Sequence, residues 1–257
     1  MLAIRGSQNL SHNKALAFSP RKAGETNGAW LSRHLPKADD GLLRLLLVGG
    51  AEPLHFRVRV AQSHFRHDMS PSHWSHVALL SYAAGKRLQL WECPLDPKDG
   101  FGYPPLDNAF RFGALKAYDD PRRFPNVALL TTSARHDEVL SKAAIHAFRH
   151  QRASVDVVAL LHAWLGYAWG VGESLNPLQH ELGVPSAAAA DTLLASAGFD
   201  LTPGVSSRAS CPEAIWQAAK WWQKPKDADE GSGAHLQGVF CIEQTLGERL
   251  PKPKTSR

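Results

Sequence analysis

The chain has 257 residues, of which 44% are hydrophobic, so it can bury a sizeable core. Its 29 Lys and Arg against 24 Asp and Glu leave a net charge of +5, too thinly spread for the dense basic stripe of a nucleic-acid-binding protein. Three cysteines without a CxxC or CxxxC spacing exclude a disulfide scaffold and a thiolate zinc site.

The first half of the chain is predicted to form mostly strands. Residues 1–40 are polar and indicate an N-terminal extension laid on the body of the protein. Apolar runs at 42–48 and 56–60 have the two-residue alternation of β-strands. Two further runs, at 77–82 and 88–91, flank a turn that contains a glycine, and they predict a hairpin.

The next part of the chain changes from loop to helix. Prolines and glycines are dense over 94–126, which predicts a long loop, and long loops in compact domains are often functional. A strand is expected at 127–131. The apolar spacing then predicts helices over 137–150 and 155–169.

Two more helices and a tail complete the chain. Ser186 stands where an N-cap would stand before a helix over 187–197. Another helix is expected over 213–222. The domain boundaries are therefore 1–40 for the extension, 41–223 for the main domain, and 224–257 for a linker and C-terminal tail with a candidate edge strand at 239–242.

No targeting or membrane segment is predicted. The N-terminal residues lack a continuous apolar stretch of signal-peptide length. The longest apolar run, at 45–51, is far shorter than the roughly 20 residues that span a bilayer. We therefore expect a cytoplasmic protein with no transmembrane segment, unless a specialised secretion system exports it.

Three positions provide the groups that nucleophilic hydrolysis needs. Such a reaction uses a nucleophile at an electropositive helix start, a nearby imidazole, and a group that orients this imidazole. His76 begins an apolar strand, and Glu92 lies on the partner strand, where cross-strand side chains touch. Ser186 supplies a hydroxyl at a helix start, where partial positive charge favours a developing anion.

Two stretches around these residues resemble a known family. The run SHVALLSYAAGKRLQLWE resembles the hairpin motif of circularly permuted papain-like hydrolases, the relatives of NlpC-type peptidases and lecithin:retinol acyltransferase-like enzymes. The segment from Ser186 to Gly204, which ends AGFDLTPG, is similar to the nucleophile helix of that family. The resemblance implies an α+β fold, with an antiparallel barrel-like sheet and packed helices in permuted papain-like topology.

The resemblance makes His76 the general base and Glu92 the residue that fixes its tautomer. The chain departs from the family at the nucleophile, because an ungapped register places the family's cysteine at Ser186. A register shifted by one residue places it at Ala187 and turns Asp191 toward the core, which is less favourable. Three explanations stay open: an authentic serine nucleophile, a natural pseudoenzyme, or an inactivating replacement of the cysteine in this chain.

Other interpretations compete for the same residues. Capping alone is a sufficient role for Ser186, and Cys211, at a helix start, is a second candidate thiol. A metal site is the third interpretation, because five residues of ligand type lie within thirteen positions. They are His64, His67, Asp68, His73 and His76.

We therefore expect a papain-like thiol-type hydrolase, a peptidase, amidase or acyl esterase, with no cofactor and no metal. Its substrate is expected to be a peptide, a protein modifier or a lipid ester, with no nucleic acid as partner. One alternative is a catalytically dead module that binds a peptide or a partner protein. The other is a metal-dependent hydrolase built from the His64–His76 cluster. The oligomeric state does not follow from the sequence.

Overall fold

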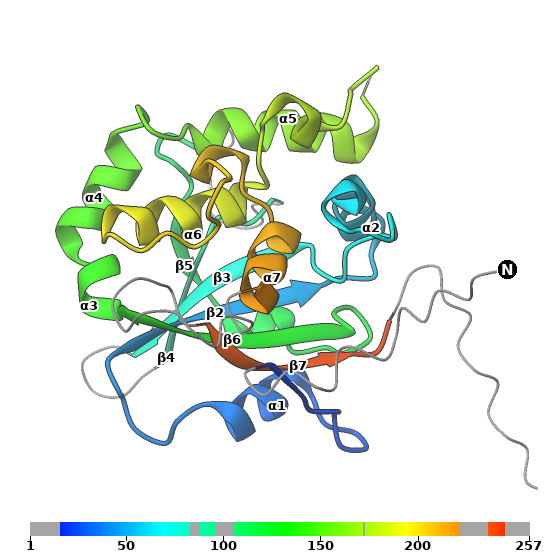
Figure 1. The fold of residues 1–257 in the computed structure, drawn as a ribbon, viewed down its shortest axis with the longest axis vertical. Helices are drawn as coiled ribbons and strands as arrows, with labels where there is room; N and C mark the ends of the chain where they lie inside the picture. The colour runs from blue at the N-terminus through cyan, green and yellow to red at the C-terminus, as the bar shows by residue number, and fades with distance from the viewer. Residues whose placement is uncertain (1–15, 83–87, 96–104, 172, 222–235, 245–257) are drawn as a thin grey trace, which may run out of the picture.

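Seven strands form one mixed sheet through the centre of the α+β fold (Figure 1). The computed structural model describes residues 16–82, 88–95, 105–171, 173–221 and 236–244. The order across the sheet is β1-β7-β6-β2-β3-β4-β5. The strands are β1 (Leu16–Phe18), β2 (Leu42–Gly49), β3 (His76–Tyr82), β4 (Leu88–Glu92), β5 (Arg111–Gly113), β6 (Asn126–Arg135) and β7 (Gln237–Ile242).

The sheet is open, with β1 and β5 at its two ends. β1 runs parallel to β7, and the other neighbouring strands are antiparallel. The expected α+β class is therefore confirmed, whereas the expectation of a barrel-like, wholly antiparallel sheet is wrong. β2 is apolar on both faces because both are covered: Leu45 and Leu47 belong to one core cluster, and Leu46 and Val48 to the other.

Helices cover the two faces of the sheet unequally (Figure 1). One face carries a thick helical layer, and the opposite face carries α1, whose Trp30 and Leu31 are buried in the second core cluster. The helices are α1 (Asn27–His34), α2 (Pro53–Ala61), α3 (His136–Val139), α4 (Lys142–His150), α5 (Val157–Trp169), α6 (Pro185–Ser196) and α7 (Pro212–Trp221). None of them, among the residues described, is long and apolar enough to cross a membrane.

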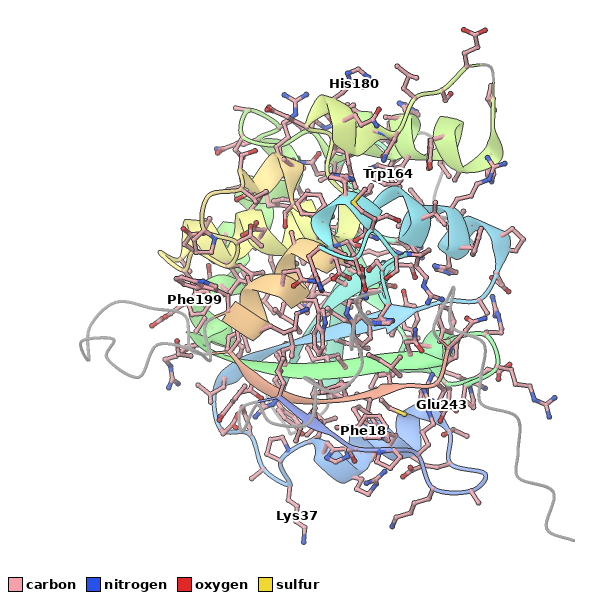
Figure 2. The ribbon with its side chains drawn as sticks, turned by 45° about the vertical axis from the view of Figure 1, so that its right-hand side comes forward. Phe18, Lys37, Trp164, His180, Phe199 and Glu243 are labelled. Atoms are coloured by element: carbon pink, nitrogen blue, oxygen red, sulfur yellow. The ribbon has the colours of Figure 1, made fainter. Side chains whose placement is uncertain are left out.

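Local sequence explains where α5 begins and ends and how it meets α6. The Asp156 carboxylate accepts hydrogen bonds from the amides of Val158 and Ala159, which caps α5, and Gly170 ends it with a φ of 67°. Trp164, labelled in Figure 2, donates from Nε1 to the carbonyl of Gly183 at 2.7 Å. This contact ties α5 to the chain just before α6.

Several predicted elements are confirmed, and three are wrong. Residues 56–60 lie in α2, not in a strand, because Pro53 suits the first turn of a helix and the short apolar run resembles a strand only by chance. The helix expected over 137–150 is split into α3 and α4, since Ser141 caps the second. β7 is not an edge strand, because residues 16–18 of the extension pair with it as β1.

Other predictions fall in the loop and in parts of the chain that are not described. The expected loop over 94–126 contains β5 and the short 3₁₀ helix η2 (Leu115–Tyr118). The hairpin turn at 83–87, and 224–235 and 245–257 of the linker and tail, lie outside the described residues.

Candidate active site

His76 and Glu92 meet at the ends of β3 and β4. The hairpin register pairs Leu79 with Trp91, so the two side chains lie on adjacent strands. Nε2 of His76 donates to Oε2 of Glu92 at 2.9 Å, and each residue is only 4% exposed. The structure therefore brings these two predicted site residues together in a buried pair.

The electrostatics of this pair favour an ionised carboxylate. Burial raises the pKa of Glu92, but hydrogen bonds from His76 and Tyr118 outweigh burial and hold this pKa below its ordinary value. An ionised carboxylate only accepts hydrogen bonds, so a neutral His76 carries its proton on Nε2 and leaves Nδ1 bare. No hydrogen bond to Nδ1 is formed by the part of the chain that is described.

Tyr118 completes a three-residue cluster that sequence reasoning missed. Its hydroxyl donates to Oε2 of Glu92, the same oxygen that accepts from His76. Its ring stacks on the imidazole, with ring centroids 5.4 Å apart and planes inclined by 20°. Tyr118 ends η2 within the proline-rich loop, where no sequence periodicity indicates which side chain turns inward.

Gly113 of β5 leaves the space that the Glu92 carboxylate occupies. A Cβ at this position would lie 2.3 Å from Oε1 of Glu92 and 2.3 Å from a methyl carbon of Leu90. Any side chain here would therefore displace the carboxylate or the strand.

Ser186 lies in the first turn of α6, against the start of β3. Its Oγ accepts a hydrogen bond from the amide of Val77 at 3.2 Å, so the hydroxyl lies beside the backbone that carries His76. The predicted N-cap position of Ser186 is wrong: α6 begins at Pro185, with Val184 as the N-cap residue. A proline suits this first position, and the Ser186 hydroxyl contacts the sheet instead of its own helix.

The imidazole and the hydroxyl approach the 76–77 peptide from different faces of the sheet. His76 stacks on Tyr118, which belongs to the core cluster with α1, whereas α6 packs in the other cluster. Within the described residues, no hydrogen bond joins Ser186 to His76. Among the described residues, the Ser186 hydroxyl thus donates no hydrogen bond and Nδ1 of His76 accepts none, although both groups lie beside the same peptide.

Ala187, the other predicted nucleophile position, is fully buried in the apolar core. The amides of Ala187 and Ala188 both donate to the carbonyl of Val184 at 2.9 Å. In the described part of the chain, the amide of Ser186 is therefore the one in this first turn without an acceptor, and it is suited to bind an oxyanion.

The register that places the nucleophile at Ser186 is expected to keep Asp191 off the buried face of α6. This expectation is wrong, because Asp191 lies on that face. It is 1% exposed and accepts a hydrogen bond from the hydroxyl of Thr202. This polar partner is what allows a carboxyl group to be accommodated in the interior.

A second serine–histidine pair lies close to His76, and sequence reasoning missed it. Oγ of Ser75 is 3.0 Å from Nδ1 of His55 and accepts from the amide of Gly50 at 3.0 Å. Burial, followed by the charge of His76, lowers the pKa of His55 to about 4. His55 is therefore neutral at physiological pH.

The predicted metal cluster does not assemble. Among the described residues, no group of three or more His, Cys, Asp or Glu is arranged to hold a metal ion. His64 packs on Phe65, and Asp68 pairs with Arg66. Cys211 is no better placed as a nucleophile, since complete burial raises the pKa of its thiol.

Comparisons with known proteins identify no family for this chain. No family model, no curated protein and no solved structure matches it. The function must therefore be argued from the chemistry of the site.

Proposed function

We propose that this protein hydrolyses an amide or ester bond in the manner of a permuted papain-like enzyme, with Ser186 in place of the family's cysteine. The observation that carries the proposal is the buried His76–Glu92 pair, joined at 2.9 Å, beside the helix start that holds Ser186. Peptides, conjugates of a protein modifier and lipid esters share the carbonyl group that this chemistry attacks.

Each residue has one role in the proposed reaction. Because the two side chains lie on different faces of the sheet, the proton of Ser186 passes to Nδ1 of His76 through a water molecule at the start of β3, while the hydroxyl oxygen attacks the carbonyl carbon. Glu92 holds the imidazole through Nε2 and stabilises the imidazolium ion that forms. The amide of Ser186 donates to the developing oxyanion, His76 then protonates the leaving group, and a water molecule hydrolyses the acyl-enzyme by the same steps.

Turnover of p-nitrophenyl acyl esters and of peptide anilides by the full chain tests the proposal. We expect measurable hydrolysis that falls at least about 100-fold in both His76→Ala and Ser186→Ala. His146→Ala, which removes an exposed imidazole on α4, is the matched control and should retain activity. Equal rates in all four proteins would show that any hydrolysis arises elsewhere.

A second candidate is a catalytically inactive module that uses the same region to bind a peptide or a partner protein. It is favoured by the Ser186 hydroxyl, which accepts from the Val77 amide and, within the described residues, forms no hydrogen bond with His76. Ser186→Cys separates the two candidates. A thiol gains hydrolysis if His76 can activate it, whereas an inactive module stays inactive with either residue.

A further inference from the structure

We propose that Tyr118 is a positioning residue for the His76–Glu92 pair and that the N-terminal segment fixes Tyr118 through Asn27. The effect on turnover rests on the proposed function, but the effect on the imidazole does not, because the state of His76 can be measured without a substrate.

Tyr118 restrains both members of the pair through different contacts. Its hydroxyl donates to Oε2 of Glu92, the oxygen that also accepts from His76, so two donors fix the orientation of one carboxylate. Its ring stacks on the imidazole at 5.4 Å and limits rotation of the His76 side chain. Loss of the hydroxyl alone therefore releases the carboxylate and keeps the stacking contact.

The buried start of α1 fixes the backbone of Tyr118. Nδ2 of Asn27 donates to the carbonyls of Tyr118 at 2.8 Å and Phe124 at 2.9 Å. The amide of Asn27 donates to the carbonyl of Asp119 at 3.0 Å, and the amide of Gly28 donates to the Asp119 carboxylate at 2.7 Å. Asn27 itself is 1% exposed, so α1 holds the loop at the tyrosine and on its C-terminal side.

Arg21 extends this support toward the N-terminus. Its Nε donates to Oδ1 of Asn27 at 2.7 Å, and its guanidinium donates to the carbonyl of Pro125 at 2.9 Å. The segment that the sequence predicted as an extension laid on the body thus supports the proposed active site, on the face of the sheet that carries α1 (Figure 1).

The arrangement has a chemical consequence for the imidazole. A carboxylate held by the tyrosine hydroxyl keeps the His76 proton on Nε2, which leaves Nδ1 bare to accept a proton. A carboxylate without this restraint can rotate, and His76 can then adopt the other neutral tautomer.

The test compares Tyr118→Phe with Tyr82→Phe in the full-length protein. Tyr82 is the matched control, because its hydroxyl also donates one hydrogen bond, to the carbonyl of Pro36 at 2.8 Å. Tyr82 lies at the other end of β3 from His76. Nitrogen-15 NMR of the His76 ring reports its tautomer and the exchange of its Nε2 proton, with His76→Gln used to assign the signals.

We expect wild type and Tyr82→Phe to show one tautomer, protonated on Nε2, with slow exchange of this proton. Tyr118→Phe should show a mixture of tautomers, faster exchange and a kcat about tenfold lower with KM unchanged. Asn27→Ala should change the His76 signals in the same direction.

A folded Tyr118→Phe variant with the His76 signals of wild type would overturn the inference. Altered His76 signals in Tyr118→Phe, together with no hydrolysis by wild type or by Ser186→Cys, would support the positioning role and reject the proposed function. The two proposals therefore fail by different results.

Discussion

Asp191 gives the helix that carries Ser186 a stability that depends on pH. Burial raises the pKa of this carboxyl from 3.8 to about 6. One pKa unit corresponds to about 1.4 kcal/mol, so ionising Asp191 in the folded protein costs about 3 kcal/mol. Because the pKa is higher in the folded state than in the unfolded state, the neutral carboxyl favours folding at low pH. This contribution to the free energy of unfolding is lost as the pH rises from about 4 to about 6.

Asp191→Asn removes the charge and keeps an oxygen that accepts from Thr202. We expect the variant to exceed wild type in free energy of unfolding by about 3 kcal/mol at pH 7.5, and this difference to shrink by about 2 kcal/mol at pH 4.5. Urea unfolding of both proteins across this range measures it. Asp137→Asn is the control, because the Asp137 side chain is 61% exposed, and it should change the free energy of unfolding little at any pH.

Two results would refute this reasoning. One is a difference between Asp191→Asn and wild type that stays constant with pH, which would mean that Asp191 does not titrate in this range in the folded state. The other is a variant less stable than wild type at pH 7.5, which would mean that the ionised carboxylate is well satisfied where it lies.

Three further substitutions test other parts of the structure. Gly113→Ala should lower turnover about tenfold, because its Cβ would displace Glu92, and unchanged steady-state rates would contradict this. Asp156→Ala should lower the free energy of urea unfolding by about 1 kcal/mol through loss of the α5 cap, and an unchanged midpoint would contradict it. Arg59→Met should cost about 3 kcal/mol in the same assay, since buried Arg59 donates to the carbonyls of Ser72 and Gly50, whereas a cost below 1 kcal/mol would show that these acceptors find other partners.

The central strands could be predicted because their sequence reports their environment directly. Most of β2 and β3 and the first half of β6 are apolar and buried on both faces, and turn-forming residues separate β3 from β4. The sequence of α2 could not be distinguished from a strand in this way, because a run of five alternating apolar and charged residues fits a strand as well as a short helix. β1 has only three residues and is a strand through its pairing with β7.

The candidate site could be predicted only where strand geometry sets distances. The hairpin brings His76 to Glu92, so the spacing in the sequence is sufficient to predict that they meet. Tyr118 contacts this pair from a long loop, and Asn27 supports Tyr118 from a helix far away in the sequence. Both contacts depend on tertiary packing, which leaves no periodic signal in the sequence. The start of α6 predicted from the sequence lies two residues too late, because both a serine N-cap and a proline first residue are favourable helix starts.

Covalent trapping of the nucleophile identifies directly whether Ser186 is the reactive group. The full chain is treated with a fluorophosphonate probe, and the modified residue is located by peptide mass spectrometry in wild type and in His76→Ala. We expect an adduct on Ser186 that is lost in the variant. An unmodified Ser186, or an adduct on Ser75, whose Oγ is 3.0 Å from Nδ1 of His55, would contradict it.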